Sequence, residues 1–150
     1  MVINTTRPKQ WTKNLLVFMA LFFTVNEAWE AGDFNDLLPL LFKTSLGFLV
    51  FCILSGAVYL TNDVTDAQRD RLHPKKRRRP IASNQLSSNV ALVVSATLSI
   101  FGIAFAFILE PLFGCIATGY LTTMIVYTLL LKQIIVLDVL AISAGFVLRA

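Results

Sequence analysis

Long apolar runs separated by short polar connections make up most of this chain. The runs cover residues 11–29, 37–60, 90–109, 112–131 and 134–150. A helix needs about 20 apolar residues to cross the roughly 30 Å hydrocarbon core of a bilayer, and each run is close to that length. The pattern therefore predicts an all-α, polytopic transmembrane helical bundle with about five spanning helices.

The apolar part of the first run, from Leu15 to Val25, also has the basic start of a signal peptide, because Arg7, Lys9 and Lys13 precede it. However, the run is not closed by a small-residue cleavage site. Trp11 and Trp29 are 18 positions apart, about 27 Å along a helix, which suits the two interfaces of one span. We therefore expect a retained first span.

Composition supports the membrane assignment. Hydrophobic residues make up 56% of the chain, charged residues only 15%, and mean hydropathy is +0.70. A soluble domain has about a quarter of its residues charged. The single histidine excludes a metal site or a catalytic triad built on several histidines.

Charge alternates along the polar connections. Three cations precede the first run, four anions lie at 27–36, seven cations and three anions lie at 63–79, and one cation stands at 132. By the positive-inside rule, the N-terminus, the Asp-rich loop at 61–89 and Lys132 are cytoplasmic. The sequence thus predicts a multi-pass protein of the cell membrane, with its acidic connector outside.

The densest polar segment begins with Asn62, Asp63, Asp66 and Asp70. On a helix, this spacing puts the carboxylates on one face with neighbouring Cβ atoms roughly 5–6 Å apart. At an effective dielectric near 20, two such charges repel by about 3 kcal/mol, so the cluster favours a bound cation. Because all ligands are oxygens, Mg²⁺ is the expected ion.

Five consecutive cations, Lys75 to Arg79, follow these acids. A metal held by carboxylates beside a group of lysines and arginines suits a diphosphate. Taken alone, the basic run is more typical of a solvated loop at a membrane face.

Further polar residues lie near the predicted cytoplasmic ends of the fourth and fifth spans. Ionisable groups at such depth are costly unless they face a cavity or one another, so Tyr127, Lys132 and Asp138 are candidates for the same site. An ion pair between Asp138 and Lys132 is the structural alternative. Arg7, Gln10 and Lys13 precede the first span on the same side, where cations are also ordinary topology signals.

Other classes fit less well. An EF-hand is excluded because the loop from Asp63 lacks its glycine and its final glutamate. A transporter would leave the diphosphate-suited cations unexplained. A non-catalytic membrane protein that binds anionic lipid through Lys75 to Arg79 would leave the acids without a role. We expect no nucleic acid partner, and the sequence identifies no protein partner.

Asn62-Asp63-x-x-Asp66-x-x-x-Asp70, followed by Lys76 and Arg79-Pro80, resembles the first aspartate-rich motif of the UbiA-type prenyltransferase superfamily. Its members are polytopic helical enzymes that act on polyprenyl substrates. Within it, the chain is most similar to the decaprenyl-phosphate phosphoribosyltransferase branch. That similarity rests on residues 7–14, 70–76, 127–139 and 145–150.

The resemblance implies transfer of 5-phosphoribose from phosphoribosyl diphosphate to a polyprenyl phosphate, without a protein nucleophile. Asp63 and Asp66 act through Mg²⁺, which Asp70 and Asn62 help to hold. The residues implied to contact the diphosphate or the lipid substrate are Lys76, Arg77, Arg79, Arg7, Gln10, Lys13, Tyr127, Lys132 and Asp138. The alternative within the superfamily is transfer of a prenyl group from a prenyl diphosphate to an aromatic or other acceptor.

The superfamily pattern has about nine transmembrane helices and a second polar motif in its later half. The 150 residues are therefore expected to correspond to the N-terminal half of such an enzyme, and we expect this half alone to lack part of the catalytic machinery.

Overall fold

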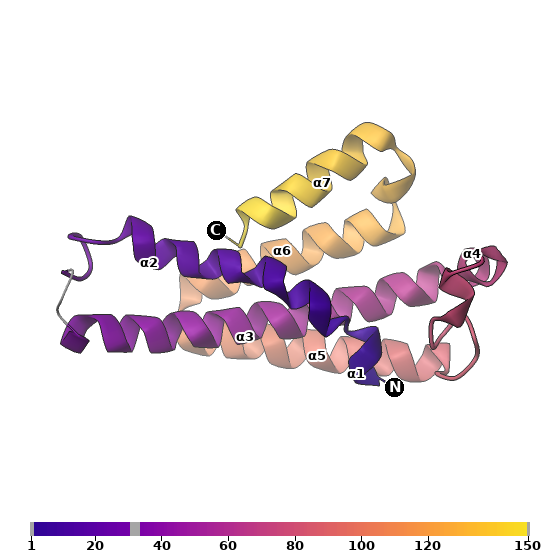
Figure 1. Cartoon of the computed structure of the whole chain (residues 1–150), viewed down its shortest axis with the longest axis horizontal. Helices are drawn as coiled ribbons and strands as arrows, with labels where there is room; N and C mark the ends of the chain where they lie inside the picture. Colours follow the sequence, from indigo (N-terminus) through magenta and orange to yellow (C-terminus); the bar gives the residue numbers. More distant parts are fainter. Residues whose placement is uncertain (1, 31–33, 150) are drawn as a thin grey trace.

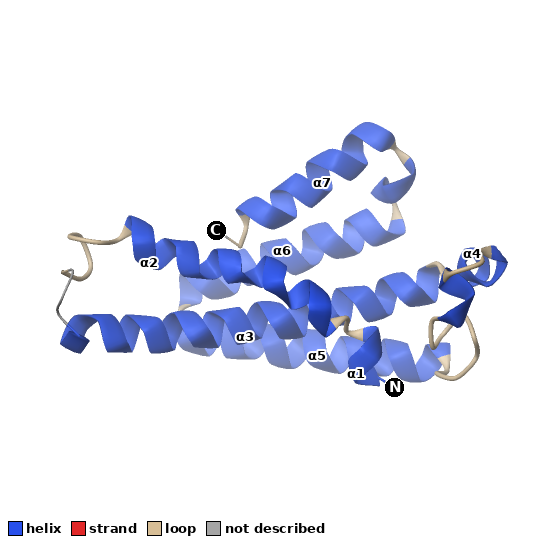
Figure 2. Ribbon diagram, in the orientation of Figure 1, coloured by secondary structure: helices blue, strands red, loops and turns tan. Residues whose placement is uncertain are grey.

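The computed structural model describes residues 2–30 and 34–149 (Figure 1). Within these residues the chain forms helices joined by short connections and contains no strand (Figure 2). Three of the described helices are long and apolar enough to span a membrane. The predicted all-α membrane bundle is confirmed. Residues 31–33 of the acidic connector and Ala150 of the last predicted span lie outside the described residues.

The three long helices are α3 (Phe34–Thr65), α5 (Ser88–Leu109) and α6 (Pro111–Leu129). They match the second, third and fourth predicted spans. With 32 residues, α3 is about 48 Å long, which exceeds the roughly 30 Å hydrocarbon thickness. The helix is therefore longer than an apolar layer of that thickness, and its last turn carries Asn62 and Asp63.

The first and fifth predicted spans do not form long α-helices. A short helix α1 (Val2–Thr5) precedes the 3₁₀ helix η1 (Pro8–Phe18), which continues into α2 (Met19–Phe23). Because a 3₁₀ helix rises about 2 Å per residue, η1 and α2 together cover about 30 Å, and Figure 1 shows them running alongside α3. The fifth segment forms α7 (Ile135–Val147), about 20 Å long.

Helix α3 is the centre of the bundle. The largest buried cluster joins its apolar residues to one residue of α5 and three of α6, namely Val50, Phe51, Leu54, Val58, Ala106, Ala117, Tyr120 and Met124. The ring of Phe51 meets those of Phe113 and Tyr120 edge to face, with centroids 5.7 and 5.3 Å apart. Such aromatic pairs fix the rotation of α6 against α3.

Helices α3 and α5 approach closely. A Cβ atom on Gly102 would lie 2.7 Å from Cδ2 of Leu54, so any larger residue there would require the buried Leu54 side chain to move. Nearer the polar end, the Ser95 hydroxyl donates to the carbonyl of Ala57 at 2.8 Å and lies 2.8 Å from the Thr61 hydroxyl. Small residues and interhelical hydrogen bonds are the usual means of packing helices in lipid.

The N-terminal segment is anchored to the opposite side of α3. The buried Asn14 amide donates to the Ser55 hydroxyl at 3.2 Å and to the Cys52 sulfur at 3.3 Å. Gly56 leaves space for Thr6, since a Cβ there would lie 3.1 Å from the Thr6 Cβ. These contacts bring Arg7 to the end of α3 where the acidic residues are found.

Candidate active site

The aspartates lie where α3 gives way to α4 (Ala67–Leu72). Asp66 stands between the two helices, yet its backbone N–H still bonds the Asn62 carbonyl at 2.9 Å, and the Asp70 N–H bonds the Asp66 carbonyl at 2.8 Å. The predicted helix thus reaches Leu72 with an irregularity at Asp66, and the acids keep a nearly helical spacing.

Asp63 and Asp70 converge on one cation. Both residues are only 3% exposed. Nη1 of Arg79 lies 3.2 Å from Oδ1 of Asp63 and 2.6 Å from Oδ2 of Asp70. The Arg7 guanidinium also donates to Oδ1 of Asp63. Buried carboxylates need such partners, because an uncompensated buried charge is strongly destabilising.

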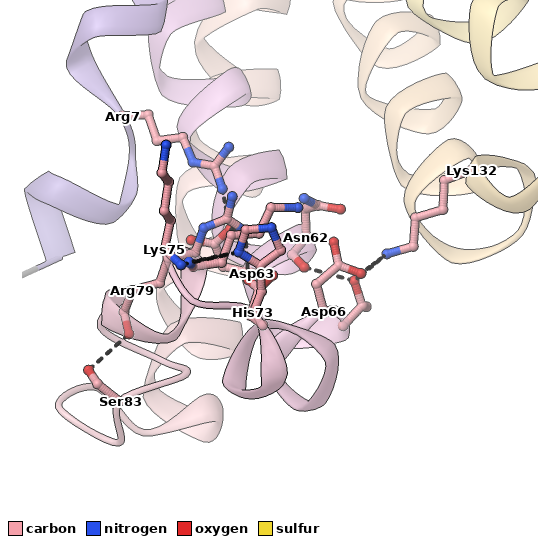
Figure 3. Close-up of polar contacts among 12 residues, drawn as sticks. Arg7, Asn62, Asp63, Asp66, His73, Lys75, Arg79, Ser83 and Lys132 are labelled. Atoms are coloured by element: carbon pink, nitrogen blue, oxygen red, sulfur yellow. Dashed lines mark hydrogen bonds and ion pairs between the residues drawn. The ribbon is translucent and has the colours of Figure 1, made fainter.

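Asp66 has a different partner. Nζ of Lys132, in the turn η3 (Leu131–Gln133), lies 2.6 Å from Oδ1 of Asp66 and donates to the Thr65 hydroxyl at 3.1 Å. Figure 3 shows Lys132 reaching Asp66 from one side while Arg7 and Arg79 approach Asp63 from the other. Asp63 and Asp70 thus share Arg79, whereas Asp66 has its own cationic partner.

Asp138, in the first turn of α7, lies near Tyr127. Its Oδ1 is buried and has no protein partner in the described structure. Lys132 pairs with Asp66, so the alternative of an ion pair between Lys132 and Asp138 is wrong. Tyr127 lies within electrostatic range of both Asp138 and Asp66.

A folded loop turns the basic run back toward the acids. Arg71 donates to the Ala82 carbonyl at 3.2 Å and to Oδ1 of Asn84 at 2.7 Å. Asn84 has a φ of 59°, a left-handed conformation that asparagine tolerates better than most residues. The Ser83 hydroxyl bonds the Arg79 carbonyl at 2.9 Å. Arg79 is thereby held with its side chain toward Asp63 and Asp70.

The other four cations of the run behave differently. Lys75 and the three residues of η2 (Lys76–Arg78) are exposed. None of them forms an ion pair in the described structure. Of the predicted phosphate ligands, Arg79 thus lies within the acid cluster, while Lys76 and Arg77 lie beside it with free ammonium and guanidinium groups.

The three N-terminal candidates, Arg7, Gln10 and Lys13, differ in whether they contact the acids. Arg7 contacts Asp63 and its guanidinium carbon lies 4.9 Å from the centre of the Tyr59 ring. Its φ of 52° is left-handed, which costs an L-residue roughly 1–2 kcal/mol. Lys13 and Gln10 are exposed, and Gln10 makes no contact with the acids.

The donor set fits a divalent cation. Asp63 and Asp70 already place one carboxylate oxygen each around a single cationic nitrogen. Mg²⁺ typically uses one or two carboxylates together with water and phosphate oxygens. No cluster of three or more Asp, Glu, His or Cys side chains suited to a metal occurs among the described residues. Of the predicted ligands, Asp63 and Asp70 are the two that share a cation in the described structure, and the metal itself stays a prediction.

Next to the acids lies a pocket of about 220 Å³ between η1, α3, α6 and α7, lined by Lys13, Asn62 and Tyr127 among others. Its lining includes one charged residue, Arg149, to which sequence reasoning assigned no role. Nη2 of Arg149 donates to the Tyr120 hydroxyl at 2.7 Å, and its guanidinium carbon lies 4.7 Å from the centre of that ring. In the sequence, the feature that could have identified Arg149 as a site residue is its position as a charged residue at the end of the last apolar run.

A family model and individual relatives both place the chain in the same protein family. A model of the UbiA prenyltransferase family matches residues 14–150. The chain is 36% identical over 149 residues to a decaprenyl-phosphate phosphoribosyltransferase of Mycobacterium tuberculosis, covering 99% of this chain and 48% of the relative. It is 34% identical, over 99% of its length and 46% of the relative, to the enzyme of that name from Mycolicibacterium smegmatis.

A digeranylgeranylglyceryl phosphate synthase of Methanococcoides burtonii is 39% identical over 93 residues, which is 62% of this chain and 32% of the relative. The chain spans about half the length of the two phosphoribosyltransferases. The matched part is their N-terminal half, as the resemblance implied.

Proposed function

Because the chain belongs to the UbiA prenyltransferase family, we propose that it forms the diphosphate-binding half of a membrane transferase that moves 5-phosphoribose from phosphoribosyl diphosphate to a polyprenyl phosphate. The observation that carries the proposal is the convergence of Asp63 and Asp70 on Arg79, with further cations around them. The names of the mycobacterial relatives support the choice of donor and acceptor.

In this proposal Asp63 and Asp70 bind Mg²⁺, which neutralises the diphosphate of the donor. Arg79 leaves the two carboxylates and binds the phosphate oxygens, because its guanidinium can pair with either kind of anion. Lys76 and Arg77 are free of carboxylate partners and extend the same cationic surface. Lys132 forms an ion pair with Asp66, and Tyr127 lies near Asp138. These contacts fix the position of the two acids in the wall of the site.

The reaction breaks the bond between C1 of the ribose and the diphosphate oxygen, and the diphosphate leaves with the bonding electrons. A phosphate oxygen of the polyprenyl phosphate supplies the electron pair of the new bond to C1. That oxygen is already ionised at neutral pH, so the protein needs neither a nucleophile nor a general base. Its contribution is positioning and charge stabilisation.

We further propose that the acid cluster faces the cytoplasm at the plasma membrane. The cations of residues 69–79 and Lys132 lie at one end of the bundle, and positive charge of this kind is retained on the cytoplasmic side. The lipid phosphate then enters from the bilayer with its tail along the apolar outer faces of the long helices, many of whose large side chains are exposed.

The test is a chimaera in which this chain replaces the matched half of the M. tuberculosis relative. Membranes containing it are given Mg²⁺, polyprenyl phosphate and radiolabelled phosphoribosyl diphosphate. We expect label in the lipid phase, and loss of that label with Asp63→Asn. Asp36→Asn, in the first turn of α3, is the matched control at the opposite end of the helix and should retain transfer. Undiminished transfer by Asp63→Asn would remove the metal role.

The similarity to a digeranylgeranylglyceryl phosphate synthase favours one second candidate, transfer of a prenyl group from a prenyl diphosphate. The same membranes distinguish the two. Labelled product from a prenyl diphosphate, with none from phosphoribosyl diphosphate, would assign the protein to that alternative. Dependence on Asp63 is expected in both cases, because both donors carry a diphosphate.

A further inference from the structure

We infer that the pocket between η1, α3, α6 and α7 is a subsite for a phosphate monoester, separate from the diphosphate site at the aspartates. The inference rests on the proposed function for its donor, which carries a diphosphate at one end and a monoester at the other. The pocket measures about 220 Å³. Its lining includes no aspartate or glutamate, and its polar members are Lys13, Ser55, Tyr59, Asn62, Tyr120, Tyr127, Thr128 and Arg149.

Charge is the first argument. Lys13 and Arg149 give the pocket two cations without a carboxylate in its wall. Every ion pair in the described residues involves other cations, so neither Lys13 nor Arg149 is neutralised by an acid. Two uncompensated cations at one concave surface attract a dianion, and arginine and lysine are the usual ligands of phosphate.

Unsatisfied donors are the second argument. Thr128 is 1% exposed, and its hydroxyl has no hydrogen-bond partner in the described structure. The same is true of Nε of Arg149, whose Nη2 is held by the Tyr120 hydroxyl. Buried polar groups are nearly always satisfied. Two such groups lining one pocket are explained by a ligand with several acceptor oxygens.

Position is the third argument. Asn62 lines the pocket and directly precedes Asp63, so a ligand in the pocket adjoins the diphosphate site. Figure 1 shows the last turn of α7 returning toward the N-terminal segment, and this return brings Arg149 and Lys13 to the same pocket although they are distant in sequence. A prenyl diphosphate has no second anionic end, so the pocket selects for a phosphorylated donor or a lipid monophosphate.

The experiment measures binding to the purified chain in detergent, with a chelator present so that metal-dependent diphosphate binding is absent. The probes are ribose 5-phosphate, ribose and a short prenyl monophosphate. We expect ribose 5-phosphate to bind and ribose not to bind. Lys13→Gln and Arg149→Gln should each weaken binding at least about tenfold. Lys43→Gln is the control, because Lys43 pairs with Glu110 at the opposite end of the bundle.

Thr128→Val separates a ligand role from a structural one. Removing an unsatisfied buried hydroxyl should raise the melting temperature of the free chain, while binding of ribose 5-phosphate weakens. Arg149→Gln also removes the bond to Tyr120, so Tyr120→Phe, which removes that bond and keeps the cation, should retain at least half of the binding.

If ribose 5-phosphate binds and its binding depends on Lys13 and Arg149, the pocket takes the phosphate monoester of the donor. The same dependence for the prenyl monophosphate alone identifies the monoester as that of the acceptor lipid. If neither probe responds to Lys13→Gln and Arg149→Gln, the inference is overturned. The binding assay involves neither metal nor transfer, so it is independent of the chimaera assay. If the chimaera fails to transfer phosphoribose while ribose 5-phosphate still binds this chain, the proposed function is wrong and the phosphate subsite is retained.

Discussion

Lys132 and Asp66, 66 positions apart in the sequence, form an ion pair with 2.6 Å between Nζ and Oδ1. The pair joins the turn after α6 to the junction of α3 and α4. As a result, the acid cluster is held from three directions, by the N-terminal segment through Arg7, by the basic loop through Arg79 and by the α6–α7 turn through Lys132.

Breaking this pair should destabilise the fold. The side chains of Lys132 and Asp66 are 16% and 23% exposed, so their pairing lies between an exposed and a buried ion pair. We expect Lys132→Gln to lower the free energy of unfolding by about 1–3 kcal/mol. A double-mutant cycle with Asp66→Asn should give a coupling energy of about 1 kcal/mol or more, and additive single effects would contradict the pair.

Gly102 should tolerate no larger side chain. Alanine there would bring a Cβ to 2.7 Å from Leu54 Cδ2, so the buried Leu54 side chain must shift within the core, and overpacking of this kind costs about 1–3 kcal/mol. Gly119 is the matched control, because nothing lies within 4 Å of a Cβ built on it. We expect a lower melting temperature for Gly102→Ala and an unchanged or higher one for Gly119→Ala. Equal responses would rule out close packing at Gly102.

The apolar pattern predicted the long helices well because a membrane span is set by length and hydropathy. The predicted spans at 37–60, 90–109 and 112–131 correspond to α3, α5 and α6. It did not predict that residues 8–18 form a 3₁₀ helix. That choice depends on contacts such as Asn14 with Ser55, 41 positions away, which no local window of sequence contains.

The sequence predicted several of the residues that lie together in the candidate site, but not which of them contact each other. Aspartate spacing along one helix placed Asp63 and Asp70 together correctly, since seven residues make nearly two turns. It could not show that Asp66 forms an ion pair with Lys132 or that Asp138 lies near Tyr127. Those partners are set by how α6 and α7 pack, and Arg149 enters the pocket for the same reason.

Arg79 should compete with the metal for the two aspartates. Its Nη1 lies between Asp63 and Asp70, where it partly neutralises the charge that attracts a divalent ion. We expect Arg79→Gln to tighten binding of Mg²⁺, or of Mn²⁺ as a spectroscopic substitute, by about tenfold, equivalent to about 1.4 kcal/mol.

The same substitution should weaken binding of diphosphate in the presence of metal, because Arg79 is then a phosphate ligand. Arg78→Gln is the control for net charge, since Arg78 is exposed and contacts none of the acids. Metal titrations of both variants by electron paramagnetic resonance check the prediction. Weaker metal binding by Arg79→Gln would mean that Arg79 organises the carboxylates rather than competing for them.

Arg7 combines a favourable contact with an unfavourable backbone. Its guanidinium pairs with the buried Asp63, while its φ of 52° is left-handed. Arg7→Ala and Arg7→Gly both lose the ion pair, but glycine adopts this conformation without steric cost. We therefore expect Arg7→Gly to be more stable than Arg7→Ala by about 1 kcal/mol.

Lys9, two residues later within η1, provides the comparison because its φ is not positive. There the order should be reversed, with Lys9→Gly less stable than Lys9→Ala by about 0.5–1 kcal/mol, since glycine loses more conformational freedom on folding. Thermal unfolding of the four variants in one detergent measures both differences. If alanine is the more stable substitution at both positions, then the left-handed turn at Arg7 is not a feature of the folded protein, and the path that carries its guanidinium to Asp63 must differ.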